Sequence, residues 1–319
     1  MSLGYACVNM QLSYPQKWGG QPKGVDPITT NRSMIRRTYK AKGVEYASEL
    51  SLKNCEDLEK IIDWNLQNGI EFYRMSSNIF PWASEHGIKA LPDYDKICEV
   101  LERCGNKAKS NNLRLTFHPG PFNKLTSPKE NVILNTIRDL EIHGETMDLL
   151  GLDRSPWAKI NIHVGAHYND KPMALDNFCK NFHRLSDSVK SRLTVENDDK
   201  ASLYSTSELY DGVYKRIGIP IVFDYHHHML HPGGQTEQEA LELALSTWPQ
   251  DIVPVVHYAE SRSEEYNNPK IKPQAHSDYV VRDFNDYGHR IDVMIEAKHK
   301  ELALLRYRDI MNNKGEKAA

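Results

Sequence analysis

One stretch of the sequence ends in an unusual density of side chains that bind metals. It begins at Ile219 and stays apolar to Phe223, which is the pattern of a strand buried on both faces. The polar residues that follow are an acid and four histidines: Asp224, His226, His227, His228 and His231. Imidazole nitrogens and carboxylate oxygens are common ligands of Zn, Mn and Fe. This density favours a metal site over a solvated strand end, because histidine seldom clusters without a metal.

Seven other apolar stretches alternate with helical patterns along the chain, as the units of a closed parallel barrel would. The sequence therefore predicts one α/β domain over residues 1–311, a single (β/α)8 TIM barrel, followed by a short lysine-containing tail at 312–319. In such barrels the functional side chains lie at the carboxyl ends of the strands. The polar residues at the eight expected ends are Asn9, Asn78, His118, His163, Glu196, Asp224, His257 and Glu296.

Histidines and acids follow five successive expected strands and the eighth, which predicts a metal cluster at the carboxyl-terminal rim. The candidate ligands are His118, His163, Glu196, Asp224, His227, His257, His276 and Glu296. One metal needs about four ligands, so this number indicates two or three divalent ions. Neighbouring ions suit in-line phosphoryl displacement, and the set favours phosphodiester hydrolysis. A sugar isomerase would also use such a rim, with fewer histidines and usually a lysine.

Individual roles follow from position. Histidines 226, 227 and 228 would alternate along an extended strand, so they cannot all face one metal. We assign His227 to the metal and give His228 a supporting or DNA-contacting role. Lys298 is a candidate phosphate contact, and a solvated lysine explains it equally well. The helical spacing around His143 places that histidine on a helix surface. The expected catalytic set is Glu196, His227, His257 and Lys298.

A basic segment and several helix signals complete the expected framework. Arg32, Arg36, Arg37, Lys40 and Lys42 form either a solvated helix face or an arm that contacts phosphates. Asn54 is a candidate N-cap for the helix that follows it, and Thr236 begins a capping box. Further helices are expected over about 93–110, 132–150 and 172–190.

Composition limits the classes of protein that fit. The net charge of −3 and the pI near 6.5 speak against nucleic-acid binding, an argument that weakens if cations occupy the rim. The five cysteines are scattered without a CxxC pair, which is typical of a reducing compartment. No signal peptide or membrane-length apolar run is apparent. We expect an intracellular, cytoplasmic monomer (nuclear in a eukaryotic host) that binds no membrane and needs no protein partner.

Ten short motifs in order resemble the UV damage endonuclease family, and together they cover nearly the whole chain. They are residues 4–9 (GYACVN), 30–32 (TNR), 72–78 (FYRMSSN) with Pro81-Trp82, 117–120 (FHPG), 161–165 (NIHVG), 195–198 (VEND), 223–228 (FDYHHH), 256–258 (VHY), 275–277 (AHS) and 293–301 (VMIEAKHKE).

The resemblance implies a TIM-barrel DNA repair enzyme that uses divalent metal, with Mn²⁺ expected and Mg²⁺, Co²⁺ or Zn²⁺ as alternatives. It would nick duplex DNA immediately 5′ of cyclobutane pyrimidine dimers and 6-4 photoproducts, leaving a 3′-hydroxyl and a 5′-phosphate. The family's metal ligands fall on the eight residues named above, His276 included. Flipping of the damaged dinucleotide is also implied. The implied DNA-contacting and lesion-contacting residues are Tyr5, Asn9, Asn31, Arg32, Arg74, Asn78, Pro121, Phe122 and His228.

The chain departs from the family pattern at three places. Pro121-Phe122 stands where the pair is often Gln-Tyr or Gln-Phe, which leaves only the aromatic wedge. Asn78 replaces a histidine of some members. Val255 replaces a lysine that some members modify into a metal-bridging carbamate, so three-metal occupancy is an open question. The alternatives at this point are an abasic-site endonuclease on the same barrel, a xylose-isomerase-like isomerase or epimerase, and a non-catalytic binder of damaged DNA.

Overall fold

The computed structural model describes the backbone of residues 1–318 and the side chains of residues 1–313. Eight parallel strands lie in the order β3-β2-β1-β8-β7-β6-β5-β4. An isolated parallel bridge between Phe117 and Ile160 joins the two ends of this sheet, so the strands close into a barrel. The predicted (β/α)8 fold is confirmed. The strands are β1 (Leu3–Ala6), β2 (Phe72–Arg74), β3 (Arg114–Thr116), β4 (Ile160–His163), β5 (Leu193–Glu196), β6 (Ile221–Asp224), β7 (Val255–Tyr258) and β8 (Asp292–Ile295).

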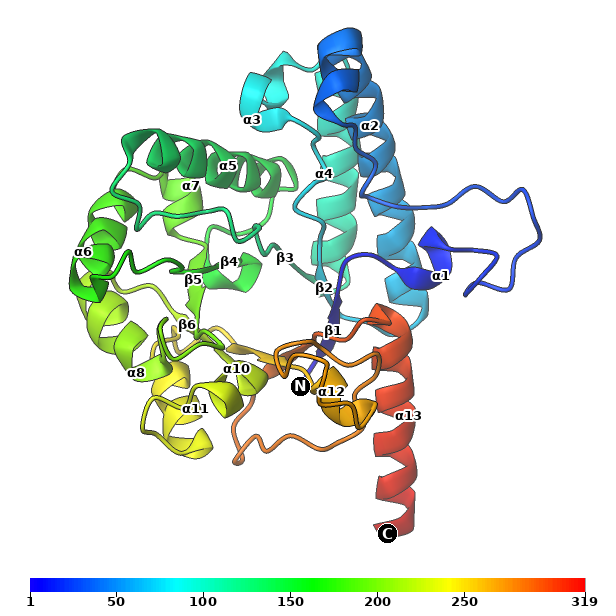
Figure 1. Cartoon of the computed structure of the whole chain (residues 1–319). Helices are drawn as coiled ribbons and strands as arrows, with labels where there is room; N and C mark the ends of the chain where they lie inside the picture. Colours follow the sequence, from blue (N-terminus) through cyan, green and yellow to red (C-terminus); the bar gives the residue numbers. More distant parts are fainter. Residues whose placement is uncertain (319) are drawn as a thin grey trace.

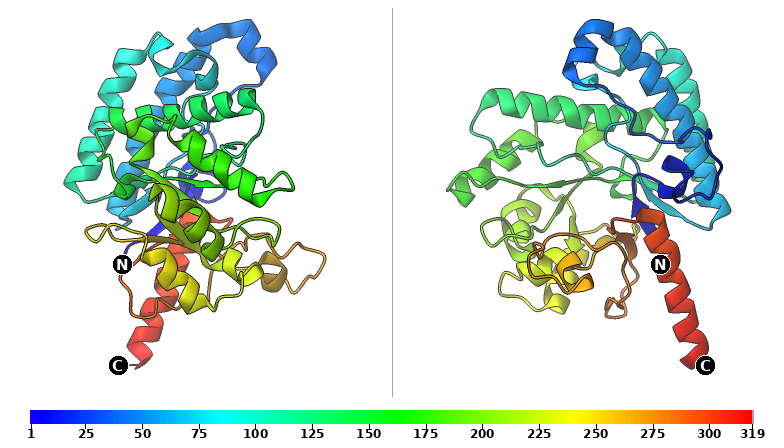
Figure 2. Two further views of the ribbon diagram at one scale, coloured as in Figure 1. Left: turned by 90° about the vertical axis from the view of Figure 1, so that its left-hand side faces the viewer. Right: turned by 45° about the vertical axis from the view of Figure 1, so that its right-hand side comes forward.

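Helices surround the strands and connect each to the next (Figure 1). The long helices α2 and α4 pack side by side, and in both views of Figure 2 the C-terminal helix α13 leaves the body of the barrel. None of the helices over residues 1–318 has the length and apolar character needed to span a membrane. The α-helices are α1 (Met10–Ser13), α2 (Arg36–Gln67), α3 (Ala83–His86), α4 (Tyr94–Ser110), α5 (Glu130–Leu149), α6 (Lys171–Phe182), α7 (Asp187–Lys190), α8 (Thr206–Leu209), α9 (Lys215–Ile217), α10 (Tyr225–Leu230), α11 (Glu237–Leu245), α12 (Arg262–Glu265) and α13 (Lys300–Ala318).

A buried arginine occupies the amino-terminal end of the barrel, opposite the rim of interest. Arg114 is fully buried at the start of β3 and pairs with Asp292 at the start of β8, at 3.0 Å. Its guanidinium also donates to the carbonyls of Trp157 and Val253 and stacks over the Trp157 ring. Burial lowers the pKa of Arg114 to about 10. An unpaired buried charge would be very unfavourable, and these partners explain why the position is tolerated.

Two expectations about the helices are corrected. Asn54 lies inside α2 rather than at its start, because the helix begins at Arg36; its amide donates instead to the Arg32 carbonyl. The helix expected over 172–190 is two helices, and Ser186 caps the second by accepting from Val189 N. The helices expected over about 93–110 and 132–150 are present as α4 and α5, and Thr236 forms the predicted capping box of α11.

The histidines after β6 are helical, which corrects the expectation of an extended strand. Strand β6 ends at Asp224, whose carboxylate accepts from His227 N and so caps α10. Successive side chains of a helix point about 100° apart, so the histidines still diverge, but for a different reason. His143 is also corrected: it is 2 % exposed in α5 and packs edge-on against Phe117.

Candidate metal centre at the barrel rim

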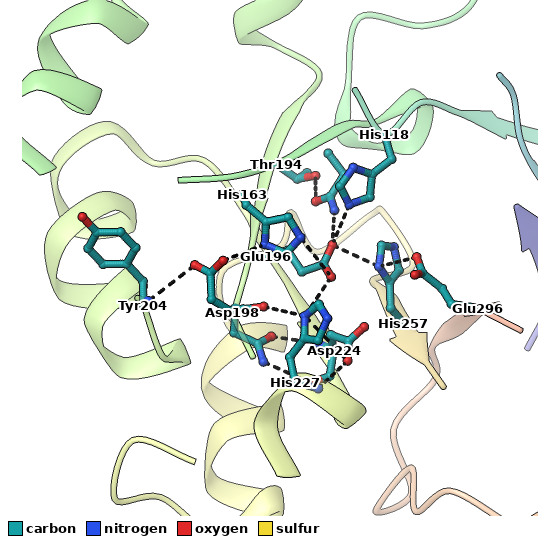
Figure 3. A network of polar contacts seen from close by, with 12 residues as sticks. His118, His163, Thr194, Glu196, Asp198, Tyr204, Asp224, His227, His257 and Glu296 are labelled. Atoms are coloured by element: carbon teal, nitrogen blue, oxygen red, sulfur yellow. Dashed lines mark hydrogen bonds and ion pairs between the residues drawn. The ribbon is translucent and has the colours of Figure 1, made fainter. Parts of the chain in front are cut away.

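The pairing register of the strands places the candidate ligands at one level. In the β4–β5 ladder His163 is the partner of Glu196, and in the β6–β7 ladder Asp224 is the partner of His257. All four stand at or near the carboxyl ends of their strands, as the sequence predicts for a functional rim. Figure 3 shows these side chains turned toward a common centre inside the barrel.

Glu196 is the centre of the cluster. Its side chain is 1 % exposed, and its Oε2 lies 3.1 Å from His118 Nε2 and 3.0 Å from His257 Nδ1. Its other oxygen, Oε1, lies 3.3 Å from His227 Nδ1 and 3.8 Å from His163 Nε2. One carboxylate therefore touches four imidazoles that come from four different strand ends (Figure 3).

Glu296 forms a second centre beside the first. Its Oε1 lies 3.2 Å from His257 Nδ1, and its Oε2 lies 3.7 Å from His276 Nδ1. His276, which belongs to a loop, is thus brought to the cluster. Asp224 joins His257 and Glu296 in one group whose ligand atoms all lie within 4.8 Å of one another. Two further groups meet the same criterion: His118 with Glu196 and His257, and His163 with Glu196 and His227.

The pKa values in the cluster are shifted because its ionisable groups are buried away from water. Burial by itself raises the pKa of Glu196, but the surrounding histidines, His257 foremost, outweigh it and hold that pKa well below its usual range. Burial raises the pKa of Asp224 to about 7 and lowers that of His257 to about 4. A neutral imidazole beside an ionised carboxylate is the protonation state in which both groups bind a cation.

The donor set fits divalent metal ions. Three buried atoms of the cluster, His163 Nδ1, Asp224 Oδ2 and His257 Nδ1, make no hydrogen bond within the described residues, although both histidine atoms lie close to carboxylates. Buried polar atoms are nearly always satisfied, so lone pairs that converge without hydrogen-bond alignment are the arrangement expected of metal ligands. The three groups share members, as sites for neighbouring ions do.

Side chains just below the rim support the ligands, and these were not singled out from the sequence. Asn161 donates to Glu196 Oε2 and accepts from Thr194 Oγ1 at 2.7 Å. Asp198 Oδ1 lies 3.2 Å from His163 Nδ1, within ion-pair distance but without hydrogen-bond alignment. Lys159 Nζ lies 3.3 Å from His257 Nε2, and burial lowers its pKa to about 7.

The period of two along a strand is the signal that could have found them. Asn161 and Lys159 lie two and four residues before His163, and Asp198 lies two after Glu196, so their side chains share the interior face. Val255 stands at the position where the family resemblance implies a lysine in some members. It lies two residues before His257 and is fully buried.

The predicted DNA-contacting residues on β2 and before α2 are placed in different ways. Arg74 forms an ion pair with Glu296 next to the cluster. Asn78 is exposed and lines a hollow of about 340 Å³ together with Phe122 and Arg138. Asn31 is exposed and is hydrogen-bonded to Ser76. Arg32 is folded back: it pairs with Asp57 at 2.6 Å and donates to two carbonyls.

The remaining predicted residues divide sharply by exposure. Phe122 is 88 % exposed beside the exposed Pro121, a geometry suited to a wedge. Tyr5 and Asn9 are fully buried and hydrogen-bonded to each other, Asn9 Nδ2 donating to Tyr5 Oη at 3.1 Å. Their contact with DNA stays a prediction that burial does not favour.

His228 and Lys298 complete the predicted set. His228 is 5 % exposed and packs on Phe223, so it supports the core beneath the rim. Lys298 is exposed, and its backbone amide donates to Ser277 O, which fixes the segment just after Glu296. A role for Lys298 in binding phosphate stays a prediction.

Comparisons with known proteins show which family the chain matches. The family model of UV-endonuclease UvdE matches residues 1–316. The UV DNA damage endonuclease of Bacillus cereus (strain G9842) is 36% identical over 319 residues, covering 97% of this chain and 94% of the relative. The UV-damage endonuclease of Schizosaccharomyces pombe is 36% identical over 310 residues, covering 95% of this chain and 49% of the relative. The chain thus spans about half the length of that yeast protein.

Solved structures extend the comparison. A crystal structure of SacUVDE matches with a TM-score of 0.81 and 28% identity, and the match covers 99% of both chains. A D-tagatose 3-epimerase-like protein matches with a TM-score of 0.53 and 14% identity over 81% of this chain and 94% of that one, which shows the shared fold alone.

Fold and rim together define a (β/α)8-barrel protein with a cluster of histidine and carboxylate side chains at the carboxyl ends of its strands. The family is established by the match along almost the entire length. The chain belongs to the UV-endonuclease UvdE family.

Proposed function

We propose that this chain is a metal-dependent DNA repair endonuclease that nicks the strand immediately 5′ of UV photoproducts. Its substrates are cyclobutane pyrimidine dimers and 6-4 photoproducts in duplex DNA, and the products carry a 3′-hydroxyl and a 5′-phosphate. The chain acts as a monomer inside the cell. Family membership supports the lesion class, and the three overlapping ligand groups on Glu196 and His257 support the chemistry. The observation that most supports the proposal is the contact of the Glu196 carboxylate with four imidazoles.

Two or three divalent ions, with Mn²⁺ proposed, would supply a hydroxide nucleophile and stabilise the leaving oxygen of an in-line displacement. The eight rim residues hold them, and Asn161 keeps the Glu196 carboxylate in place. Arg74, beside Glu296, offers a cation to a phosphate that enters the rim. Lys298 is proposed as a second phosphate contact. Water access is limited because Glu196, Asp224 and His257 are almost fully buried.

Lesion recognition is proposed for the loop after β3. Phe122 projects from the surface and has the apolar area to stack in the gap left by an extruded dinucleotide. The polar hollow beside Phe122, with Asn78 on its wall, offers amide groups to displaced bases. Pro121 has no amide hydrogen, so the wedge acts by stacking rather than by hydrogen bonding.

The test compares three labelled duplexes that differ at one position: a cyclobutane dimer, an abasic site and undamaged DNA. With Mn²⁺, the proposal predicts rapid nicking of the dimer duplex, no cutting of undamaged DNA, and loss of activity in EDTA that added Mn²⁺ restores. Cutting restricted to the abasic duplex would replace the proposal with an abasic-site endonuclease. No cutting of any duplex by metal-loaded protein would refute the nuclease function.

A further inference from the structure

The N-terminal part of α2, residues 36–46, extends beyond the packed body of the barrel and is called the α2 arm. Helix α2 has 32 residues, and its first buried residue is Ala47. The arm is therefore about 16 Å of helix without a buried side chain. Gly43, with φ 69° and ψ −160°, breaks the helical geometry within it. Tyr39 and Val44 of the arm pack against the core, and both are only partly buried.

Aromatic contacts fix the arm to the loop that leads from the rim. The ring of Tyr39 stacks on that of Trp82 with centroids 5.0 Å apart and an interplanar angle of 6°. Trp82 Nε1 donates to the Met34 carbonyl at 2.9 Å. Trp82 is the N-cap of α3 and lies four residues after Asn78, in the loop that follows β2. In Figure 1 the start of α2 and α3 stand together at the top of the view. The arm is thus held in place rather than free.

The arm carries exposed cations that lack acidic partners. Arg36, Arg37, Lys40 and Lys42 are all exposed, and the single acid of the arm is the exposed Glu45, near its inner end. Within the described part of the chain, none of the four takes part in an ion pair, whereas Arg32 just before them is neutralised by Asp57. Arg36 and Lys40 are one turn apart, on the same face of the helix. The net charge of the chain is −3, so this local excess is not a general feature of its surface.

We propose that the α2 arm binds the phosphate backbone of duplex DNA beside the lesion, with Arg36, Arg37 and Lys40 as the contacts. This inference rests on the proposed function, because it assumes duplex DNA on the rim. The arm is braced against the β2 loop that carries Asn78, next to the hollow beneath Phe122. A duplex gripped there is positioned over the rim without any contact to its bases, so the arm contributes affinity and not sequence preference.

The experiment compares two variants of equal charge. Arg36→Ala/Lys40→Ala removes one Arg and one Lys from the arm. Lys109→Ala/Arg290→Ala removes one of each from the amino-terminal side of the barrel, where Lys109 lies near the end of α4 and Arg290 just before β8. Binding to undamaged and dimer-containing duplexes is measured from low to moderate salt, and thermal unfolding verifies that both variants fold.

The arm variant should bind both duplexes about tenfold more weakly at low salt, and its slope of log K against log salt should be shallower by about 1.8. The control should match wild type, and in nicking assays the arm variant should raise KM. Equal slopes for the two variants, with wild type still nicking the dimer, would overturn the inference and leave the function standing. If wild type nicks no duplex but the arm variant still loses DNA affinity, the proposed function is refuted and the inference about the arm stands.

Discussion

Glu196 Oε2 lies 3.0 Å from His257 Nδ1 at the centre of the rim, without hydrogen-bond alignment. Glu196→Gln keeps the shape of the side chain and removes its charge, so bound divalent metal should fall by at least one ion per chain. Metal analysis of the dialysed protein and calorimetric titration with Mn²⁺ measure this. Glu99→Gln, on an exposed position of α4, is the matched control. Unchanged metal content in Glu196→Gln would contradict the assignment of the centre.

Asp198→Asn tests the support of a ligand rather than the ligand itself. Asp198 Oδ1 lies 3.2 Å from His163 Nδ1, on the side of the ring opposite the Nε2 that faces Glu196, so we expect its charge to orient the imidazole. Loss of such a carboxylate typically weakens metal binding about 10-fold to 100-fold. Calorimetric titration with Mn²⁺ should show this drop in affinity. Asp199→Asn, which removes the same charge at the adjacent position, should leave the affinity unchanged. A variant pair with identical metal affinities would show that His163 needs no such support.

Phe122→Ala tests the wedge. Because the ring is 88 % exposed, its removal should leave the melting temperature unchanged. Stacking of an aromatic ring on a base is worth about 1–3 kcal/mol, so kcat/KM on the dimer duplex should fall roughly 10-fold to 100-fold. Phe122→Trp keeps a stacking surface and should retain most of the activity. If the alanine and tryptophan variants nick the dimer duplex as fast as wild type, Phe122 is not a wedge.

Glu301 gives a pH dependence that is separate from the rim. It accepts from the amides of Met10 and Gln11, and burial raises its pKa to about 7. In the unfolded chain the pKa of a glutamate is about 4.3. Between this pKa and the folded pKa, the native state holds a proton that the unfolded state has released. The stability that this bound proton contributes to the native state is fully present below about pH 4.3 and is lost as the pH rises through about 7.

The measurement is denaturant unfolding of wild type and Glu301→Gln between pH 4 and pH 8. Glutamine cannot ionise, so the stability difference between variant and wild type should shift in favour of the variant by about 3 kcal/mol across this range. Glu242→Gln, on the exposed side of α11, serves as the control. Parallel curves for Glu301→Gln and wild type would show that Glu301 does not carry this proton.

The barrel could be predicted from the sequence because parallel strands buried on both faces are apolar throughout and end abruptly in polar residues. The same rule placed His118, His163, Glu196, Asp224, His257 and Glu296 at the rim, whereas the loop residue His276, which the family resemblance added, is brought to Glu296 by the structure. What the sequence did not reveal depends on tertiary context. Asn54 has the residue type of an N-cap, yet Arg32 and Ile79 supply partners for its amide inside α2. His143 has the spacing of a surface position, yet Phe117 covers it.

Support for the ligands was missed for a different reason. Asn161 is a polar residue within β4, and Lys159 and Asp198 flank β4 and β5, so only the closed barrel brings them within reach of Glu196, His257 and His163. Arg32 is a further residue whose surroundings cannot be known from sequence, and its contact with DNA stays a prediction. Its pairing with the buried Asp57 takes up the charge that a DNA contact would need.

The position of the nick relative to the dimer, and the chemistry of its two ends, test the proposed function most strictly. A duplex with one defined cyclobutane dimer, labelled at either end, is treated with Mn²⁺-loaded wild type or with Glu196→Gln. Wild type should make a single nick immediately 5′ of the dimer, with a 3′-hydroxyl that a polymerase extends and a 5′-phosphate that a ligase accepts, and Glu196→Gln should make no nick. A cut elsewhere, other termini, or full activity of Glu196→Gln would contradict the proposed function.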